Sequence, residues 1–198
     1  MSNSAKWTGD TVTGPKTVTV SQPVERIPLW HKAGGLTILA SEPTLRVDDQ
    51  DWSELTLEAF PHDSPSDVTT RTFVDRGAAE AQTTVEMRTD MDAAEVHFAI
   101  TAAEDNAERA WVLRIHLAPG QRVSHAEAVL GSDDGQDGAE LETETATVRH
   151  LSAVSESDAA DFMPFGGKGT RPAVGAGPIA ELVLSSSAKP RTVRVRLK

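Results

Sequence analysis

Apolar and polar residues alternate along most of this chain, and this period of two is the strongest constraint on its fold. The clearest runs are Thr17–Val20, Glu54–Phe60, Val96–Ile100, Trp111–Leu117 and Val193–Leu197. Alternation of this kind places one face of a strand on a core and the other in water. About eleven such runs are separated by glycine- and proline-containing turns. The sequence therefore predicts an all-β fold, an antiparallel β-sandwich of about eleven strands with little helix.

Two stretches interrupt the alternation. Asp48–Trp52 forms a polar hinge after the first group of strands, and Ser155–Pro178 contains five glycines and three prolines. A stretch of that length and composition is usually either a binding loop or disordered. We expect the 155–178 loop to dock on its own domain, with contact to a partner or disorder as the alternatives.

The charge of the chain limits its partners. Its 198 residues carry a net charge of −11, which opposes binding to a nucleic-acid backbone or an anionic membrane surface. The absence of cysteine excludes disulfides, thiol catalysis and cysteine-ligated zinc. The start of the chain shows no signal region, so we expect a soluble, cytoplasmic protein without a membrane partner, although a signal on a longer parent protein would not be seen.

Few residues suggest catalysis or metal binding. No nucleophile elbow, phosphate-binding loop or His-Glu-x-x-His motif is present. His97 and His116 could pair across strands as metal ligands, but we favour an outward-facing strand histidine at each position. Asp133, Asp134 and Asp137 resemble a hard-oxygen ligand set for Ca²⁺, although their spacing is not that of an EF-hand and such turns are common without metal. The sequence predicts no cofactor.

Tryptophans are the residues best suited to stack on a sugar ring. Trp111 lies within an alternating run, so we expect it in the core. Trp30 and Trp52 flank turns and are the candidates for carbohydrate binding. The apolar cluster that includes Phe162 and Phe165 could instead anchor the 155–178 loop.

One stretch is more specific than the rest, and it runs from Gln22 to Leu39. It resembles the end of the proximal C-terminal β-domain of glycoside hydrolase family 31, the α-glucosidase and α-xylosidase family, where Ile-Pro is followed by an arginine, a glycine and a serine. The positions that match are Pro23, Ile27, Pro28, Gly34 and Leu36, with Lys32 near the usual arginine and Gly35 in place of the serine.

Downstream segments extend the resemblance. Leu55–Pro61 is similar to the first strand of the distal C-terminal β-domain of that family, and Thr72–Gly77 keeps Asp75 and Gly77 of its Leu-Tyr-Glu-Asp-Asp-Gly segment. The resemblance implies that residues 1–41 are the last strands of a proximal domain, which could pack on the rest, and that residues 42–198 form a distal β-sandwich. The departures leave the substrate of the parent enzyme open.

The catalytic part of family 31 is not in this sequence. Its nucleophile lies in a Trp-x-Asp-Met-Asn-Glu motif on a (β/α)₈ barrel, which takes about 250 residues. The resemblance therefore implies a non-catalytic accessory region that packs on the barrel of a larger α-glycosidase, with Leu29, Trp30, Phe162 and Phe165 as candidate docking residues. The alternatives are a carbohydrate-binding module for α-linked oligosaccharides and an independent hydrolase with a carboxylate pair.

Overall fold

The computed structural model describes residues 2–5, 11–21, 30–41, 44, 49–62, 67–74, 82–102, 108–131, 142–151 and 178–198. Within these ranges, no helix is long and apolar enough to cross a membrane. The described residues form β-strands and turns almost throughout.

Fourteen strands occur in this part of the chain. They are β1 (Ser2–Ala5), β2 (Thr11–Thr13), β3 (Trp30–Lys32), β4 (Leu36–Ala40), β5 (Glu54–Ala59), β6 (Val68–Val74), β7 (Gln82–Asp90), β8 (Glu95–Ala102), β9 (Arg109–His116), β10 (Val123–Leu130), β11 (Glu142–Thr145), β12 (Thr147–Leu151), β13 (Ile179–Ser187) and β14 (Arg191–Leu197).

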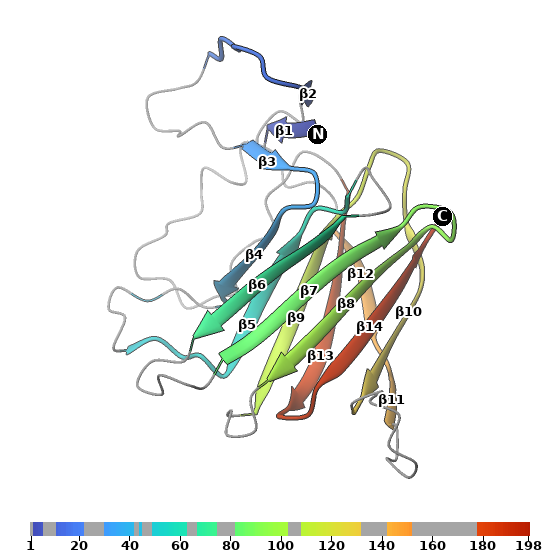
Figure 1. Ribbon diagram of the computed structural model, residues 1–198. Coiled ribbons are helices and arrows are strands. Elements are labelled where there is room, and N and C mark those ends of the chain that lie inside the picture. Colours follow the sequence, from blue (N-terminus) through green and yellow to red (C-terminus); the bar gives the residue numbers. More distant parts are fainter. Residues whose placement is uncertain are drawn as a thin grey trace.

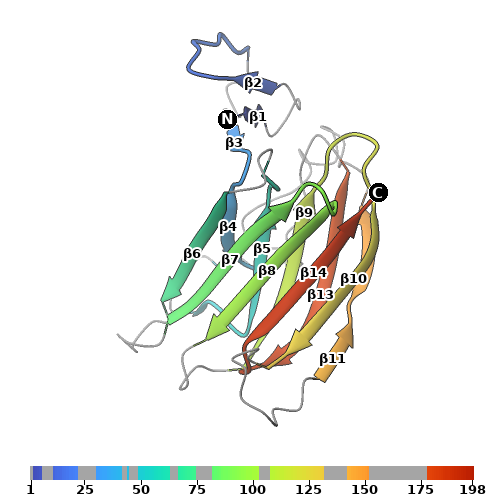
Figure 2. The same ribbon diagram turned by 45° about the vertical axis from the view of Figure 1, so that its right-hand side comes forward.

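Two sheets face each other across the core. One has six strands in the order β11-β10-β14-β8-β7-β6, and the other has five in the order β12-β13-β9-β5-β4. Every described pair is antiparallel except β5 and β9, which run parallel (Figure 1). A separate sheet, β2-β1-β3, lies at one end of this sandwich (Figure 2). The predicted all-β sandwich is confirmed, and its two sheets hold the expected number of strands.

The alternating sequence pattern builds the core directly. On β14, Val193, Val195 and Leu197 are buried, whereas Thr192, Arg194 and Arg196 are exposed on the outer face. Trp111 of β9 is 2% exposed and lies in the core cluster, as its place in an alternating run predicts. Removal of each such side chain from water stabilises the fold by about 1.5–3 kcal/mol.

Different devices close the two open sides of the sandwich. On one side, the chain passes directly from β11 to β12 through the buried Ala146. On the other side, side chains of β6 reach the backbone of β4 and of the turn before it: Thr69 Oγ1 donates to Gly34 O at 2.6 Å, and Arg71 Nε donates to Leu36 O at 3.0 Å. These bonds satisfy one carbonyl oxygen of the edge strand β4 and one of the turn that leads into it.

The expected strand at Thr17–Val20 is wrong. These residues are described and have no strand partner among the described ranges, and Val18 and Val20 are 44% and 41% exposed. Alternation records a preference for the extended state, but a strand forms only where a neighbouring strand accepts its backbone hydrogen bonds.

The division at residue 41 remains a prediction. β4 lies before that boundary, yet it pairs along its whole length with β5, from Leu36↔Ala59 to Ala40↔Leu55. The strands β3 and β4 therefore belong to different sheets, although only the turn at residues 33–35 separates them along the chain.

Candidate functional site

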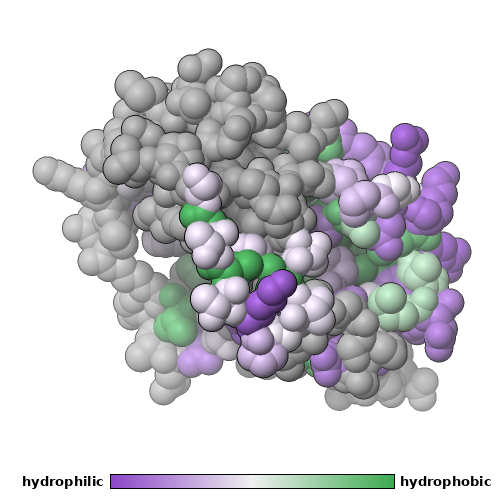
Figure 3. All heavy atoms as spheres, turned by 90° about the horizontal axis from the view of Figure 1, so that it is seen from above, coloured by the Kyte–Doolittle hydropathy of each residue, from purple (hydrophilic) through white to green (hydrophobic). Residues whose placement is uncertain are grey.

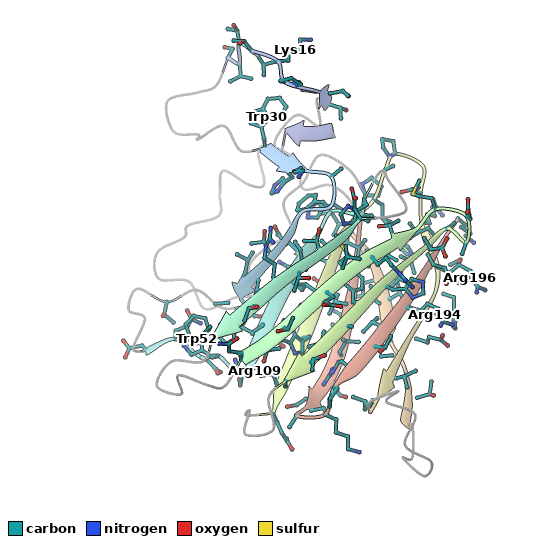
Figure 4. The ribbon with its side chains drawn as sticks, in the orientation of Figure 1. Lys16, Trp30, Trp52, Arg109, Arg194 and Arg196 are labelled. Carbon is teal, nitrogen blue, oxygen red and sulfur yellow. The ribbon has the colours of Figure 1, made fainter. Side chains whose placement is uncertain are left out.

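Trp30, a candidate for both sugar binding and docking, starts β3 in the small sheet. It pairs with Ala5 of β1 and is half-buried. Successive side chains of a strand point to opposite faces, and the next residue, His31, stacks on Phe60 of the sandwich. Trp30 therefore projects away from the sandwich, toward the part of the chain that carries Lys16 (Figure 4).

Trp52, the other candidate, lies at the opposite end of the sandwich, just before β5 (Figure 4). It is half-buried, and its ring packs on Phe73 with 5.6 Å between ring centroids. Arg109 holds both residues, because its Nη1 donates to Trp52 O at 2.7 Å and its guanidinium lies 4.8 Å from the Phe73 centroid. The two tryptophans therefore do not share a binding face, and Trp52 already packs against another ring.

A cluster of three stacked rings joins the small sheet to the sandwich. Phe60 is stacked between two histidine rings, at 4.0 Å from His31 and 4.1 Å from His116. His31 comes from β3, His116 ends β9, and Phe60 directly follows β5. We call these three residues the stacked joint. The stacked joint connects the small sheet to the five-stranded sheet of the sandwich through ring contacts.

A second set of contacts supports the same junction. Gly34 has φ of +77°, a left-handed conformation that glycine adopts without steric cost, and its N–H donates to Phe60 O at 2.8 Å. The His62 ring occupies the space where a Cβ of Gly34 would lie. The backbone N–H of His62 donates to Thr89 Oγ1 at 2.9 Å.

Asp67, His62 and Thr69 lie in a row like that of a hydrolase triad, but their hydrogen bonds run the other way. Thr69 has one hydroxyl hydrogen and donates it to Gly34 O at 2.6 Å. His62 Nε2, 3.0 Å from that hydroxyl, must then donate to it. His62 Nδ1 is 4.0 Å from Asp67, too far for a hydrogen bond. In this arrangement His62 donates to the Thr69 hydroxyl and is not placed to remove its proton.

A charged network covers part of the outer face of the six-stranded sheet. Arg196 donates to Glu95 Oε1 from Nε at 3.0 Å and from Nη2 at 2.7 Å, and Arg194 Nη1 lies 3.4 Å from Glu127. The hydrogen bond from Arg196 lowers the pKa of Glu95. Burial lowers the pKa of His97, and this effect outweighs the opposing influence of Glu95 at 3.3 Å.

Hydropathy separates this charged side from the end that carries the small sheet. Seen from that end, hydrophobic and weakly polar residues lie beside a strongly hydrophilic patch, while the described residues toward the right are mostly hydrophilic (Figure 3). Val18 and Val20 are the exposed large hydrophobic residues of the 11–21 segment.

The histidines do not form the cross-strand pair considered from the sequence. His97 lies on β8 of the six-stranded sheet and His116 on β9 of the five-stranded sheet. His116 also differs from the outward-facing histidine that we expected, since it stacks on Phe60. Among the described residues, no three histidine or acidic side chains are grouped to hold a metal ion.

Several predicted residues lie outside the described ranges. They are the docking candidates Leu29, Phe162 and Phe165 and the calcium candidates Asp133, Asp134 and Asp137. Sequence reasoning missed the stacked joint and His62. The sequence holds one signal for this junction: the Gly34-Gly35 pair is typical of a tight turn, although it does not indicate which rings pack against that turn.

The fold and this site define a two-sheet β-sandwich with a small sheet attached at one end. No family model matches the sequence, and no curated protein matches it. The solved structures that it resembles include the uncharacterized protein lmo2446 of Listeria monocytogenes EGD-e, with a TM-score of 0.57 and 13% identity over 98% of this chain. Another is the α-1,4-glucan lyase of Gracilariopsis lemaneiformis, with a TM-score of 0.50 and 12% identity over 98% of this chain.

These likenesses show the fold alone, because the identities are so low. This chain spans 16% of the Listeria protein and 19% of the lyase. The same fold therefore forms a small part of two much longer proteins, which is compatible with an accessory domain.

Proposed function

We propose that this chain is a non-catalytic C-terminal β-sandwich region of a family 31-like α-glycosidase, and that it packs on and supports a (β/α)₈ barrel encoded outside this sequence. The observation that carries the proposal is the lyase match, in which nearly the whole chain corresponds to 19% of an enzyme of glycoside hydrolase family 31. The Ile27-Pro28 and Gly34 motif points independently to the same family.

The stacked joint supports an accessory role. It fixes the small sheet against the sandwich through Phe60, so both would move together as one support. The same glycine that matches the family motif, Gly34, makes the turn that this junction needs. The hydrogen-bond directions at His62 and Thr69 argue against a hydroxyl nucleophile at this place.

Co-expression tests the proposal. The chain would be produced together with the family 31-type barrel encoded in the same genome, and the two would be purified through a tag on the barrel. We expect a stoichiometric complex and an active barrel that loses stability when this chain is omitted. A barrel that remains monomeric and fully stable alone would contradict the proposal, as would α-glucoside hydrolysis by this chain that one Asp or Glu substitution abolishes.

A carbohydrate-binding module is the second candidate, and the half-buried Trp52 beside Phe73 is the observation that favours it. Titration of the chain with α-linked gluco- and xylo-oligosaccharides, followed by tryptophan fluorescence, separates the two roles. A saturable change that Trp52→Ala removes and Trp30→Ala retains would establish binding at Trp52. A flat response would leave the accessory role.

A further inference from the structure

β6 is an edge strand with an unusual surface. It forms the margin of the six-stranded sheet, and among the described ranges only β7 pairs with it (Figure 1). Val68 and Val74 at its two ends are 55% and 53% exposed, more than any other large hydrophobic residue described. Its register with β7 runs without a shift over all seven residues, from Val68↔Arg88 to Val74↔Gln82. A regular edge strand offers backbone N–H and C=O groups to another strand; on β6, the Thr70 carbonyl also accepts a hydrogen bond from Arg71 Nη1 at 2.8 Å.

The outward-facing residues of β6 have the same order in both directions. They are Val68, Thr70, Thr72 and Val74, and all four are exposed. A two-fold axis through Arg71 would set Val68 of one copy opposite Val74 of the other, and Thr70 opposite Thr72. Directly opposed β-branched pairs of this kind stabilise a sheet by about 0.2–1 kcal/mol each.

We propose that β6 pairs antiparallel with β6 of a second copy of this chain, so that the two six-stranded sheets become continuous. The self-complementary order of the strand favours a second copy over an unrelated partner, because a two-fold interface presents the same surface twice. This inference is independent of the proposed accessory function.

The charge of β6 is more favourable to self-pairing than the charge of the whole chain. Two copies with net charge −11 repel each other, but β6 contains no acidic residue. Arg71 meets its own copy at the axis, where its Nε is held by Leu36 O and its Nη1 by Thr70 O at 2.8 Å. Both repulsions weaken as salt rises, so the dimer becomes tighter at high salt, unlike an association that depends on ion pairs.

The size of the interface sets the expected affinity. A seven-residue edge offers less than the roughly 1,200 Å² at which specific interfaces become stable. The dissociation constant should therefore be micromolar or weaker.

Sedimentation equilibrium of the full chain tests the proposal, at protein concentrations up to about 1 mM and from about 0.05 M to about 1 M NaCl. We expect a monomer–dimer equilibrium that shifts toward dimer at high salt. Val68→Lys should raise the dissociation constant roughly tenfold, because each change alters two symmetric pairs. The double variant Val68→Lys/Val74→Glu places opposite charges across the axis and should restore much of the affinity.

Val183→Lys is the matched control, since Val183 is an exposed valine (37%) on β13 of the other sheet. It should leave the dimer unchanged. A chain that stays monomeric under all these conditions overturns the proposal. So does a dimer that Val68→Lys leaves intact, or one that Val183→Lys weakens equally. Circular dichroism of each variant separates lost pairing from lost folding.

Discussion

At the scale of single residues, Gly34 is a position where the backbone tolerates little change. Its left-handed φ disfavours any side chain, and the His62 ring fills the space where a Cβ would lie. Gly34→Ala should therefore lower the free energy of unfolding by about 2–4 kcal/mol, through backbone strain and overpacking together. Urea denaturation measures this change.

Gly120→Ala provides the control for that experiment. Gly120 also has a left-handed φ, of +85°, but no atom lies within 4 Å of its Cβ position. Gly120→Ala should lower the free energy of unfolding by only about 1–2 kcal/mol, through backbone strain alone. Equal losses in the two variants would show that the contact with His62 contributes nothing.

His97 gives stability a dependence on pH. Burial lowers its pKa below the ordinary 6.5 in the folded protein, so the unfolded chain takes up a proton first as pH falls. Stability should therefore decrease as the pH falls through about 6.5 toward the lowered pKa of the folded state, and His97→Gln should flatten this part of the profile. Glu95 adds a second loss at lower pH, because its lowered pKa favours the folded state only while the carboxylate is ionised. A profile in His97→Gln as steep as in the unchanged protein would contradict this assignment.

At the scale of elements, the outer face of the five-stranded sheet carries a row of charged side chains, several of which are buried. Arg114 of β9 is 2% exposed, and its Nε donates to Glu181 Oε2 of β13 at 3.0 Å. Glu58 of β5 is opposite Arg114 in the parallel register and is 4% exposed. Arg149 of β12 continues the row at 4.0 Å from Glu181. Charges of alternating sign thus cross four neighbouring strands.

Removal of Arg114 should be costly for this reason. Arg114→Met leaves the Glu181 carboxylate without its hydrogen bond inside the protein, and we expect a loss of about 3–5 kcal/mol in thermal or urea denaturation. Arg149→Met is the matched control, because the Arg149 side chain is 64% exposed, and it should cost about 0–1 kcal/mol. A loss for Arg149→Met as large as that for Arg114→Met would refute the argument from burial.

At the scale of the whole molecule, the stacked joint should govern how firmly the small sheet is attached. His31→Ala removes one of the two rings that enclose Phe60 while leaving the sandwich core in place. We expect faster amide hydrogen exchange in β1 and β3 and little change in the core strands β8 and β9. Uniform acceleration across all strands would mean that the small sheet and the sandwich open as one unit.

How well a structural feature can be predicted from this sequence depends on how far apart along the chain the residues that form it lie. Alternation is local, and it correctly predicts strands such as Val193–Leu197 and the buried Trp111. It fails at Thr17–Val20, where the pattern has no neighbouring strand among the described residues. The stacked joint could not be predicted, because His31, Phe60 and His116 meet only once three separate strands have paired. The calcium and loop-docking residues remain predictions, since they lie outside the described ranges.

The parallel pair of β5 and β9 has a consequence for how this chain reaches its fold. Glu54 pairs with Ala110, so residues far apart in the sequence must come together before these two interior strands of the sheet can pair. No hairpin can nucleate such a pair, and domains dominated by non-local pairing fold in about milliseconds to seconds. During that interval the apolar faces of β5 and β9 remain open to other chains. The yield of refolded protein should therefore fall as the protein concentration rises, even though the folded protein itself is stable.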